Sequence, residues 1–532
     1  MRTKDPEGET EGSQRTYSTG RDNPLNRKWL RWLRWFRSNR RLIAGIGIVL
    51  LVPAILIMVP VLVSPFWFTF HGGVTITGIK EGHGQDVEIP GRIFGLPVTD
   101  IGNNAFRLCE GLVSITIPDG VTSIGNNAFA NCKDLGSVQL PDSVTCIGES
   151  AFENCENLRS VGIPHSITNI GRRAFYGCKK LRSIRIPSGT TNLGTEAFCR
   201  CEELTSIQIP SGMTTIGEDV FCDCVGLTSV TIPVGMMCIT KGTFRRCNNL
   251  TSIAIPVGLE QIADNVFEGC EKLTSIEIPG SVSYIGVGAF NGCDGLTQVS
   301  LPDGVTSIRA NTFNGCSGLT SMVIPSSVVN IEDTAFRDCD GLTSITIHEG
   351  VMNLGWNVFT GCRRLTKITI PGTVKNIDSG TFNHCSELGC IEVAPKNRYY
   401  KSIGGVLFTR DGQTLIRCPE GKSGTYAIPT DVTCIWETAF ENCDGLTSLS
   451  LPDSVTCIKY RAFGGCTHLM SITIPQSVTE IGGQAFEQCG QLTVVTTRQS
   501  AADLYAQEHG IPVEDASEGR DTHRRPHGSD AK

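Results

Sequence analysis

A segment of 23 residues repeats along most of this chain, and it limits the possible fold more than any other feature. One copy runs from Leu273 to Gly295 as L-T-S-I-E-I-P-G-S-V-S-Y-I-G-V-G-A-F-N-G-C-D-G, and Leu296 begins the next. A fixed period of this length is typical of a solenoid, in which each repeat forms one coil. One repeat position is a cysteine in sixteen copies: Cys109, Cys132, Cys155, Cys178, Cys201, Cys224, Cys247, Cys270, Cys293, Cys316, Cys339, Cys362, Cys385, Cys443, Cys466 and Cys489.

Each position in the repeat has a physical role. Ile276 and Ile278 alternate with polar residues, which predicts a short strand with one face in the core and one in water. Pro279 has no backbone N–H and ends the strand. Phe290 and Cys293 fill the core from the opposite wall of the coil. Since one coil buries too little apolar surface to fold alone, we expect the coils to stack into one continuous core.

The repeat resembles that of the BspA-type leucine-rich repeat proteins. Their pattern, L-x-x-I-x-I-P-x-x-V-x-x-I-G-x-x-A-F-x-x-C-x-x, fits this chain from about Ile101 to Leu492. The resemblance implies a mainly-β, leucine-rich-repeat-like solenoid with a curved parallel sheet, usually at a microbial surface and often linked to adhesion. The departures are local: His348 replaces the proline, Thr190, Met213 and Met236 replace the valine, and Arg309 and Lys459 replace the glycine.

An uncharged run near the N-terminus predicts one transmembrane helix over residues 42–64. At about 1.5 Å per residue the run is about 34 Å long, enough to cross a hydrocarbon core of about 30 Å. Residues 1–26 are polar and are expected to form a disordered cytoplasmic tail. Residues 27–41 form a basic segment with interleaved aromatic side chains. A cleaved signal peptide is the alternative reading of the apolar run, and a buried core helix is a third.

The charge asymmetry around this run predicts its orientation. Seven basic residues within 27–41 lie directly before it, and none follows until Lys80. The N-terminus is therefore expected in the cytoplasm and the repeats outside the cell, in a single-pass membrane protein. The basic segment is expected to meet anionic lipid, with calmodulin-like or nucleic-acid binding as alternatives. The aromatic side chains of residues 66–70 are expected to form the outer aromatic belt.

The remaining segments follow from breaks in the repeat. Residues 71–100 are an irregular copy and are expected to form the N-terminal cap coil, followed by regular repeats over 101–395. Residues 396–425 carry Asp411-Gly412 between apolar strands, which predicts an inserted β-hairpin that projects from one edge. Regular repeats resume over 426–495. Ser500 begins a cap helix within 496–513, and 514–532 is expected to be a disordered tail.

The chain has 24 cysteines, and those outside the repeated position differ in their expected chemistry. The repeated cysteines are expected to be packed thiols that behave as small apolar residues. Cys199 and Cys222 lie one period apart, as do Cys434 and Cys457, so each pair falls on adjacent coils and is expected to form a disulfide outside the cell. The C-x-C spacing at Cys199 and Cys222 is too weak a signal for zinc, and no metal is expected.

No catalytic constellation is evident in the sequence. It lacks the zinc-protease, nucleophile-elbow and phosphate-loop motifs, and its net charge of −7 gives no overall attraction to nucleic acid. We therefore expect neither an enzyme nor a cofactor, and no nucleic-acid partner.

The strand positions that face away from the core form a broad, mostly uncharged surface. Such a surface suits a protein or glycan partner better than a charged small ligand, and the predicted function is a membrane-anchored binding protein. A structural surface protein without a single ligand is the alternative, in which serine and threonine are soluble, strand-compatible filler. The candidate partner-binding residues, expected on a concave face, are Thr116, Gln139, Arg185, Gln208, Thr231, Glu277, Ser300, Thr346 and Thr369.

A local basic patch lies within this mildly acidic chain. Stacking would bring its residues onto adjacent coils, where they could dock an acidic protein or a sulfated glycan. The alternative is a solvated face that Glu156, Glu196, Glu202 and Glu203 neutralise. The patch residues are Arg159, Arg172, Arg173, Lys179, Lys180, Arg182 and Arg185.

Overall fold

The computed structural model describes residues 64–378, 380–424 and 426–516. The predicted tail, the basic segment and all but the last residue of the predicted span over 42–64 lie outside the described residues, as does 517–532. Within the described part, no helix is both long and apolar enough to cross a membrane.

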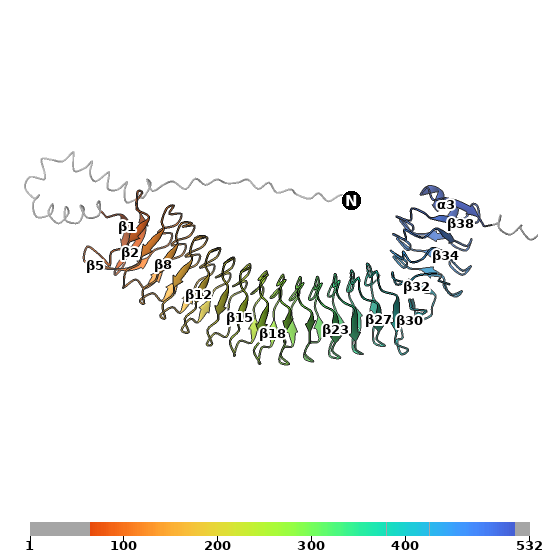
Figure 1. Cartoon of the computed structure of the whole chain (residues 1–532), viewed down its shortest axis with the longest axis horizontal. Coiled ribbons are helices and arrows are strands. Elements are labelled where there is room, and N and C mark those ends of the chain that lie inside the picture. The colour runs from red at the N-terminus through yellow and green to blue at the C-terminus, as the bar shows by residue number, and fades with distance from the viewer. Residues whose placement is uncertain (1–63, 379, 425, 517–532) are drawn as a thin grey trace, which may run out of the picture. The chain divides into compact units, whose positions relative to one another are not determined.

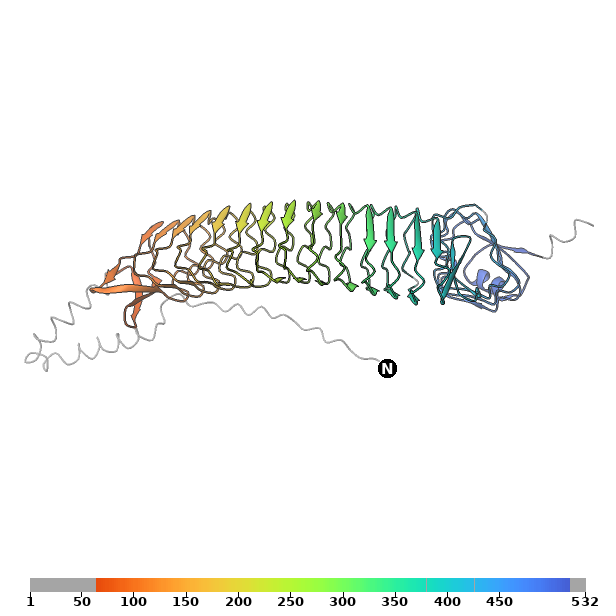
Figure 2. The ribbon, with the colours of Figure 1, turned by 90° about the horizontal axis from the view of Figure 1, so that it is seen from below.

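Each regular coil adds a strand to one or both of two rows of parallel strands (Figure 1). We call these rows ladders, and each divides into several short sheets. Residues 23 positions apart face each other within a sheet, as Ser206 and Ser229 do. The strand arrows of the first ladder line one side of the coils in Figure 2. The first ladder consists of β3 (Asp86–Glu88), β6 (Ser114–Thr116), β8 (Ser137–Gln139), β10 (Ser160–Gly162), β12 (Ser183–Arg185), β14 (Ser206–Gln208), β15 (Ser229–Thr231), β17 (Ser252–Ala254), β19 (Ser275–Ile276), β21 (Gln298–Val299), β23 (Ser321–Ile324), β25 (Ser344–Ile347), β27 (Lys367–Ile370), β29 (Cys390–Val393), β34 (Ser448–Ser450), β36 (Ser471–Thr473) and β38 (Thr493–Thr496).

The second ladder is made mostly of two-residue strands, because the chain turns again directly after the core isoleucine or leucine. It consists of β5 (Leu96–Ile101), β7 (Ser123–Ile124), β9 (Cys146–Ile147), β11 (Asn169–Ile170), β13 (Asn192–Leu193), β16 (Cys238–Ile239), β18 (Gln261–Ile262), β20 (Tyr284–Ile285), β22 (Ser307–Ile308), β24 (Asn330–Ile331), β26 (Asn353–Leu354), β28 (Asn376–Ile377), β33 (Cys434–Ile435), β35 (Cys457–Ile458) and β37 (Glu480–Ile481).

Two stacked columns run through the core between the ladders. The phenylalanine rings from Phe106 to Phe382 stack face to face, with centroids 5.1–6.1 Å apart in consecutive coils. Beside them, the repeated cysteines other than Cys109 and Cys443 donate their S–H to the carbonyl oxygen of the phenylalanine one coil earlier, as Cys293 Sγ does to Phe267 O at 3.1 Å. The cysteine is therefore a hydrogen-bond donor between coils as well as a small buried side chain.

The hairpin predicted around Asp411-Gly412 is present, but it is built into the solenoid and does not project. Strands β30 (Tyr400–Ile403), β31 (Val406–Thr409) and β32 (Thr414–Arg417) pair antiparallel in that order. β32 then pairs parallel with β33, so the insertion continues the second ladder and does not project from its edge. The physical reason is that a strand with unpaired backbone groups is stabilised by adding to a ladder.

Both ends of the described solenoid differ from the sequence-based boundaries. The N-terminal cap begins at β1 (Phe66–Phe70), before residue 71, because β1 pairs antiparallel with β2 (Val74–Ile79); β4 (Arg92–Ile93) pairs with β5 in the same cap. At the C-terminal end, α3 (Ala501–Glu508) is capped by Ser500, whose side chain accepts from Asp503 N. β39 (Val513–Asp515) then pairs with β38, so residues 514 and 515, predicted as disordered, cover a strand edge.

Candidate functional site

The nine strand residues predicted to contact a partner are all exposed, on the first ladder or directly beside it; we call them the strand face. In the parallel register Arg185 lies beside Gln208, and Gln208 lies beside Thr231. Glu277 and Ser300 directly follow the short strands β19 and β21. The structure therefore arranges these residues one per coil along one surface.

A column of threonines next to the strand face has a role within the fold. Thr228 Oγ1 donates to Thr205 O at 3.1 Å, and Thr343 Oγ1 donates to Thr320 O at 3.1 Å. These bonds join each coil to the coil before it. Part of the serine- and threonine-rich character of this side of the solenoid therefore serves coil stacking.

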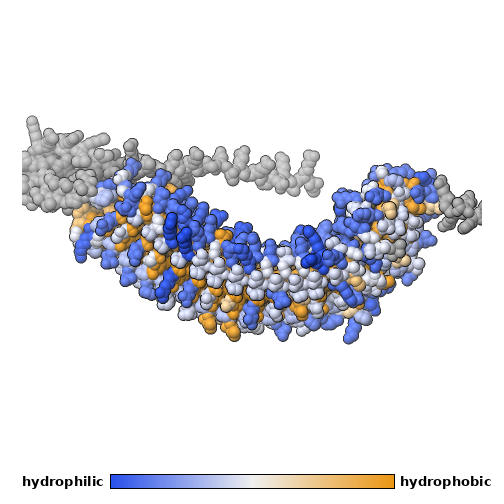
Figure 3. Space-filling model, in the orientation of Figure 1, coloured by the Kyte–Doolittle hydropathy of each residue, from blue (hydrophilic) through white to orange (hydrophobic). Residues whose placement is uncertain are grey.

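A groove of about 380 Å³ crosses strands β12, β14 and β15 of the strand face. Polar strand-face residues lie beside buried isoleucines, and Val234 lies at the groove with 79% of its surface exposed. Val257, at the same position in the next coil, is 83% exposed; Figure 3 shows other hydrophobic side chains gathered in patches among the polar ones. The groove is lined by His165, Arg185, Ile186, Ser188, Gln208, Ile209, Pro210, Ser211, Thr231, Ile232, Pro233 and Val234.

The sequence-based list contained three of these residues, Arg185, Gln208 and Thr231, and missed the others. A signal for Val234 was present, because valine follows the strand-ending proline in Pro233-Val234-Gly235 and again in Pro256-Val257-Gly258. Most other coils place a polar or small residue there. Exposing a valine to water in two consecutive coils is unfavourable, and a binding surface would explain why both are exposed.

The seven residues of the basic patch do not form one free cationic surface. Arg159 and Arg185 have no acidic partner among the described residues, and Glu202 forms no ion pair there. The other five are held by neighbours: Arg172 by Glu196 at 3.7 Å, Arg173 by Glu153 at 3.4 Å and by Glu196 at 3.2 Å, Lys179 by Glu156 at 3.4 Å, Arg182 by Glu203 at 2.9 Å and Lys180 by Asn157 at 2.7 Å.

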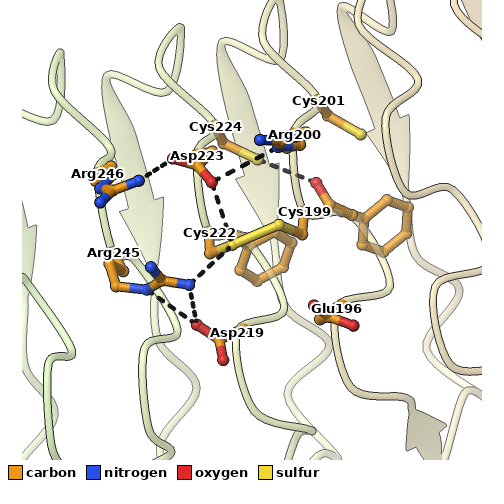
Figure 4. The surroundings of a disulfide bond; sticks show 12 residues. Glu196, Cys199, Arg200, Cys201, Asp219, Cys222, Asp223, Cys224, Arg245 and Arg246 are labelled. Carbon is orange, nitrogen blue, oxygen red and sulfur yellow. Dashed lines mark hydrogen bonds and ion pairs between the residues drawn. A yellow bond between two sulfur atoms is a disulfide. The ribbon is translucent and has the colours of Figure 1, made fainter. Parts of the chain in front are cut away.

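The two predicted cysteine pairs are bonded as disulfides, Cys199–Cys222 and Cys434–Cys457, with Cα atoms 4.6 Å and 4.9 Å apart. Around the first, Arg245 Nη2 lies 3.1 Å from Asp219 Oδ1 and 3.8 Å from Cys222 Sγ (Figure 4). The ligand atoms of Cys199, Cys222 and Asp223 lie within 4.8 Å of one another. Because the two sulfurs are bonded to each other, this group does not offer thiolate ligands to a metal.

The repeated cysteines differ in reactivity according to their place in the column. In the interior, burial raises the pKa of Cys155 to about 12 and that of Cys270 to about 12. At the N-terminal end, the adjacent Cys132 thiol lowers the pKa of the half-buried Cys109 to about 7. The adjacent Cys466 thiol likewise lowers the pKa of Cys489 at the other end.

Comparison with solved structures finds several bacterial leucine-rich repeat proteins. One from Bacteroides ovatus is 28% identical, with 85% of this chain and 98% of that chain covered and a TM-score of 0.47. A leucine-rich cell surface protein from Faecalibacterium prausnitzii is 25% identical, with 83% and 96% covered and a TM-score of 0.42. The T. pallidum leucine-rich repeat protein is 29% identical over 44% of this chain and 89% of that chain, with a TM-score of 0.28.

No curated protein matches this chain. The model of the BspA type leucine-rich repeat region matches over residues 99–227, 214–339, 306–411 and 422–507, which together span well over half of the sequence. These residues are the stacked coils and the insertion described above. The chain belongs to the BspA-type leucine-rich repeat family.

Proposed function

We propose that this chain is a membrane-anchored cell-surface protein that binds an extended segment of a partner protein across strands β12, β14 and β15. The groove on the strand face carries the proposal. Membership of the BspA-type leucine-rich repeat family supports this proposal, because it suggests a role in protein interaction or adhesion. Solenoids in general also bind partners along their extended surfaces.

The chemistry of the groove favours an acidic and apolar protein segment. Arg185 brings a guanidinium without an acidic neighbour among the described residues, and Gln208 and Thr231 supply hydrogen-bonding groups on a floor without charge. Val234 and Pro233 supply apolar contacts at one end. A carboxylate near Arg185 followed by a small apolar side chain near Val234 would use both ends of the groove.

A sulfated glycan fits this surface less well. Such a polymer needs several free cations in a row, and most of the nearby basic side chains already contact carboxylates on adjacent coils. A glycan would also leave the exposed Val234 and Val257 without apolar contact. The exposed Val234 and Val257 therefore favour a protein segment over a glycan as the partner.

Binding is tested by screening the full chain, reconstituted in lipid nanodiscs, against a random peptide library. We expect enriched peptides to pair an acidic residue with a small apolar one, and Arg185→Gln to weaken their binding about tenfold, which corresponds to ~1.4 kcal/mol. Arg364→Gln is the matched control, since Arg364 is an exposed arginine in a distant coil. Equal peptide binding by both variants would contradict the proposal that the groove is the binding site. A library without enriched peptides would favour a structural surface protein without a single ligand.

The proposed anchoring rests on the uncharged run over 42–64 and the basic residues before it. The N-terminus lies in the cytoplasm and the coils lie outside the cell in this proposal. Protease added to intact cells is then expected to degrade the coils and to spare residues 1–41. Protected coils, or a mature N-terminus that begins after Ser64, would contradict the proposed topology.

A further inference from the structure

Three phenylalanines from two separate elements meet at the N-terminal end of the solenoid. Phe68 and Phe70 lie on β1, and Phe94 lies in the turn between β4 and β5. The ring centroids of Phe68 are 5.5 Å from Phe70 and 5.7 Å from Phe94, and Phe70 is 6.4 Å from Phe94. Phe70 is 51% exposed and Phe94 is 38% exposed. We call this group the cap cluster.

The backbone at Phe94 indicates that its side chain is needed there. Ile93 pairs with Leu96, so Phe94 and Gly95 form a two-residue turn in which both have positive φ, 54° and 79°. Such a turn prefers Asn-Gly, because asparagine tolerates the left-handed region and a bulky aromatic residue does not. Strain of this kind is retained where the side chain has a use that offsets it.

The tip of this turn is apolar throughout and has a basic residue behind it. Residues 94–97 read Phe-Gly-Leu-Pro and are all exposed. Arg92 Nη1 donates to Gly95 O at 2.7 Å and holds the turn closed. Trp67 on β1 is half-exposed, and Lys80 Nζ, directly after β2, lies 5.3 Å from the centre of its ring. Aromatic side chains with nearby cations are typical of surfaces that contact the lipid headgroup region.

The position of the cap cluster in the sequence points to its occupant. The uncharged run ends at Ser64, and β1 begins at Phe66. Two residues span at most about 7 Å, so a bilayer crossed by the run would begin next to β1. This continuity favours lipid over a second protein as the cover of the exposed rings.

We propose that the cap cluster, Phe68, Phe70 and Phe94, docks into the outer lipid interface and thereby holds the first coil against the membrane. This inference rests on the anchoring proposed above and adds a second contact to it, made by folded residues of the cap. A chain held only at Ser64 would pivot about one point. A chain that also inserts the turn at Phe94 presents the strand face at a set orientation to the membrane surface.

The test uses the full chain in phosphatidylcholine–phosphatidylglycerol vesicles, with tryptophan added as a reporter in the variants Phe70→Trp and Phe94→Trp. The added fluorescence, measured against the wild-type chain, is compared between ordinary vesicles and vesicles with brominated acyl chains, which quench tryptophan on contact. We expect bromine to remove about half or more of the added signal in both variants. Val257→Trp, at an exposed turn in a regular coil, is the matched control and is expected to keep its signal.

Vesicle flotation in the same samples separates this inference from the anchoring itself. Flotation with quenching of both reporters supports the docked cap. Flotation without quenching overturns the docked cap and leaves the anchor in place. A chain that does not float overturns both proposals. A cap reporter that is blue-shifted yet insensitive to bromine assigns the cluster to protein contact, either with residues 42–63 or with a second copy, and also overturns lipid docking.

Discussion

The Arg417 guanidinium donates a hydrogen bond to Glu420 Oε1 at 2.7 Å, and the two side chains are only 2% and 4% exposed. The pair lies where the insertion interrupts the coils. In regular coils an N–H such as that of Gly361 donates to the next coil, here to Asn383 O at 2.9 Å.

At the interruption, this pair supplies the groups that the missing coil would have supplied. His384 N donates to Glu420 Oε1 at 2.7 Å, where a backbone carbonyl would otherwise accept. Phe382 O accepts from Arg417 Nη2 at 3.3 Å, in place of the cysteine S–H that reaches Phe359 O in the previous coil. Arg417 also bonds the carbonyl oxygens of Thr438 and Glu441 on the far side. The pair therefore joins two stretches of regular solenoid.

Arg417→Met is expected to destabilise this junction by about 3–5 kcal/mol, because it leaves Glu420 buried without its cation. Arg309→Met, which removes an exposed pair with Glu332, is the control and should cost about 1 kcal/mol or less. Hydrogen exchange of the amides at 382–384 and 438–441 reports the local effect, and urea unfolding reports the total. Similar losses in both variants would contradict the role assigned to Arg417.

Alkylation by iodoacetamide is expected to separate the end cysteines from the interior ones. Cys109, with its pKa lowered to about 7, is largely thiolate at pH 8 and protonated at pH 5.5, so its reaction rate should rise steeply between these values. Cys155, with its pKa raised to about 12, stays protonated and buried throughout. Mass spectrometry of the native chain should find Cys109 labelled first and Cys155 labelled only after unfolding; equal labelling would be evidence against the packed column.

The disulfide between Cys199 and Cys222 closes a loop with a sequence separation of 23. A loop of this size restricts the unfolded chain enough for a stabilisation of about 3 kcal/mol. The double variant Cys199→Ala with Cys222→Ala is expected to lose about that amount in urea unfolding under oxidising conditions. The control is to treat both chains with a reductant. The wild-type chain should lose the stability that both disulfides provide, and the variant should lose only what the bond between Cys434 and Cys457 provides. An unchanged unfolding midpoint would show that the bond adds nothing.

Phe94→Asn is expected to stabilise the lipid-free cap, since asparagine accepts the left-handed backbone at this turn and phenylalanine pays about 1 kcal/mol for it. Two ring contacts are lost in exchange, so the net gain should be several tenths of a kcal/mol. Thermal unfolding of the cap measures this gain. It is followed by the fluorescence of Trp67, taken as the difference between a chain with Trp67 and a matched chain with Trp67→Phe. A loss of more than about 1 kcal/mol would mean that the ring is a packing residue of the cap.

The period of 23 residues was enough to predict the coil, because each apolar position has a single place in a repeating unit. Ile276 faces the core and Phe290 falls on a column, as the alternation of apolar and polar residues requires. Ser500 as a helix cap was equally readable, since its side chain acts on a backbone N–H only three residues away. Such features depend on local chemistry and on neighbouring coils of nearly the same sequence. The structure of one coil can therefore be applied to the other regular coils.

Only the tertiary structure decided what happens where the repeat is broken. The sequence around Asp411 indicates two strands and a turn, yet the strand that follows pairs with β33 because an open ladder edge lies beside it. Arg417 reads as an ordinary strand residue and becomes a buried donor to three carbonyls from two coils. Likewise, whether Arg182 or Arg185 stays free depends on a carboxylate placed by stacking, which Arg182 finds in Glu203. These outcomes depend on contacts between residues far apart in the chain, and no local pattern specifies which groups will meet.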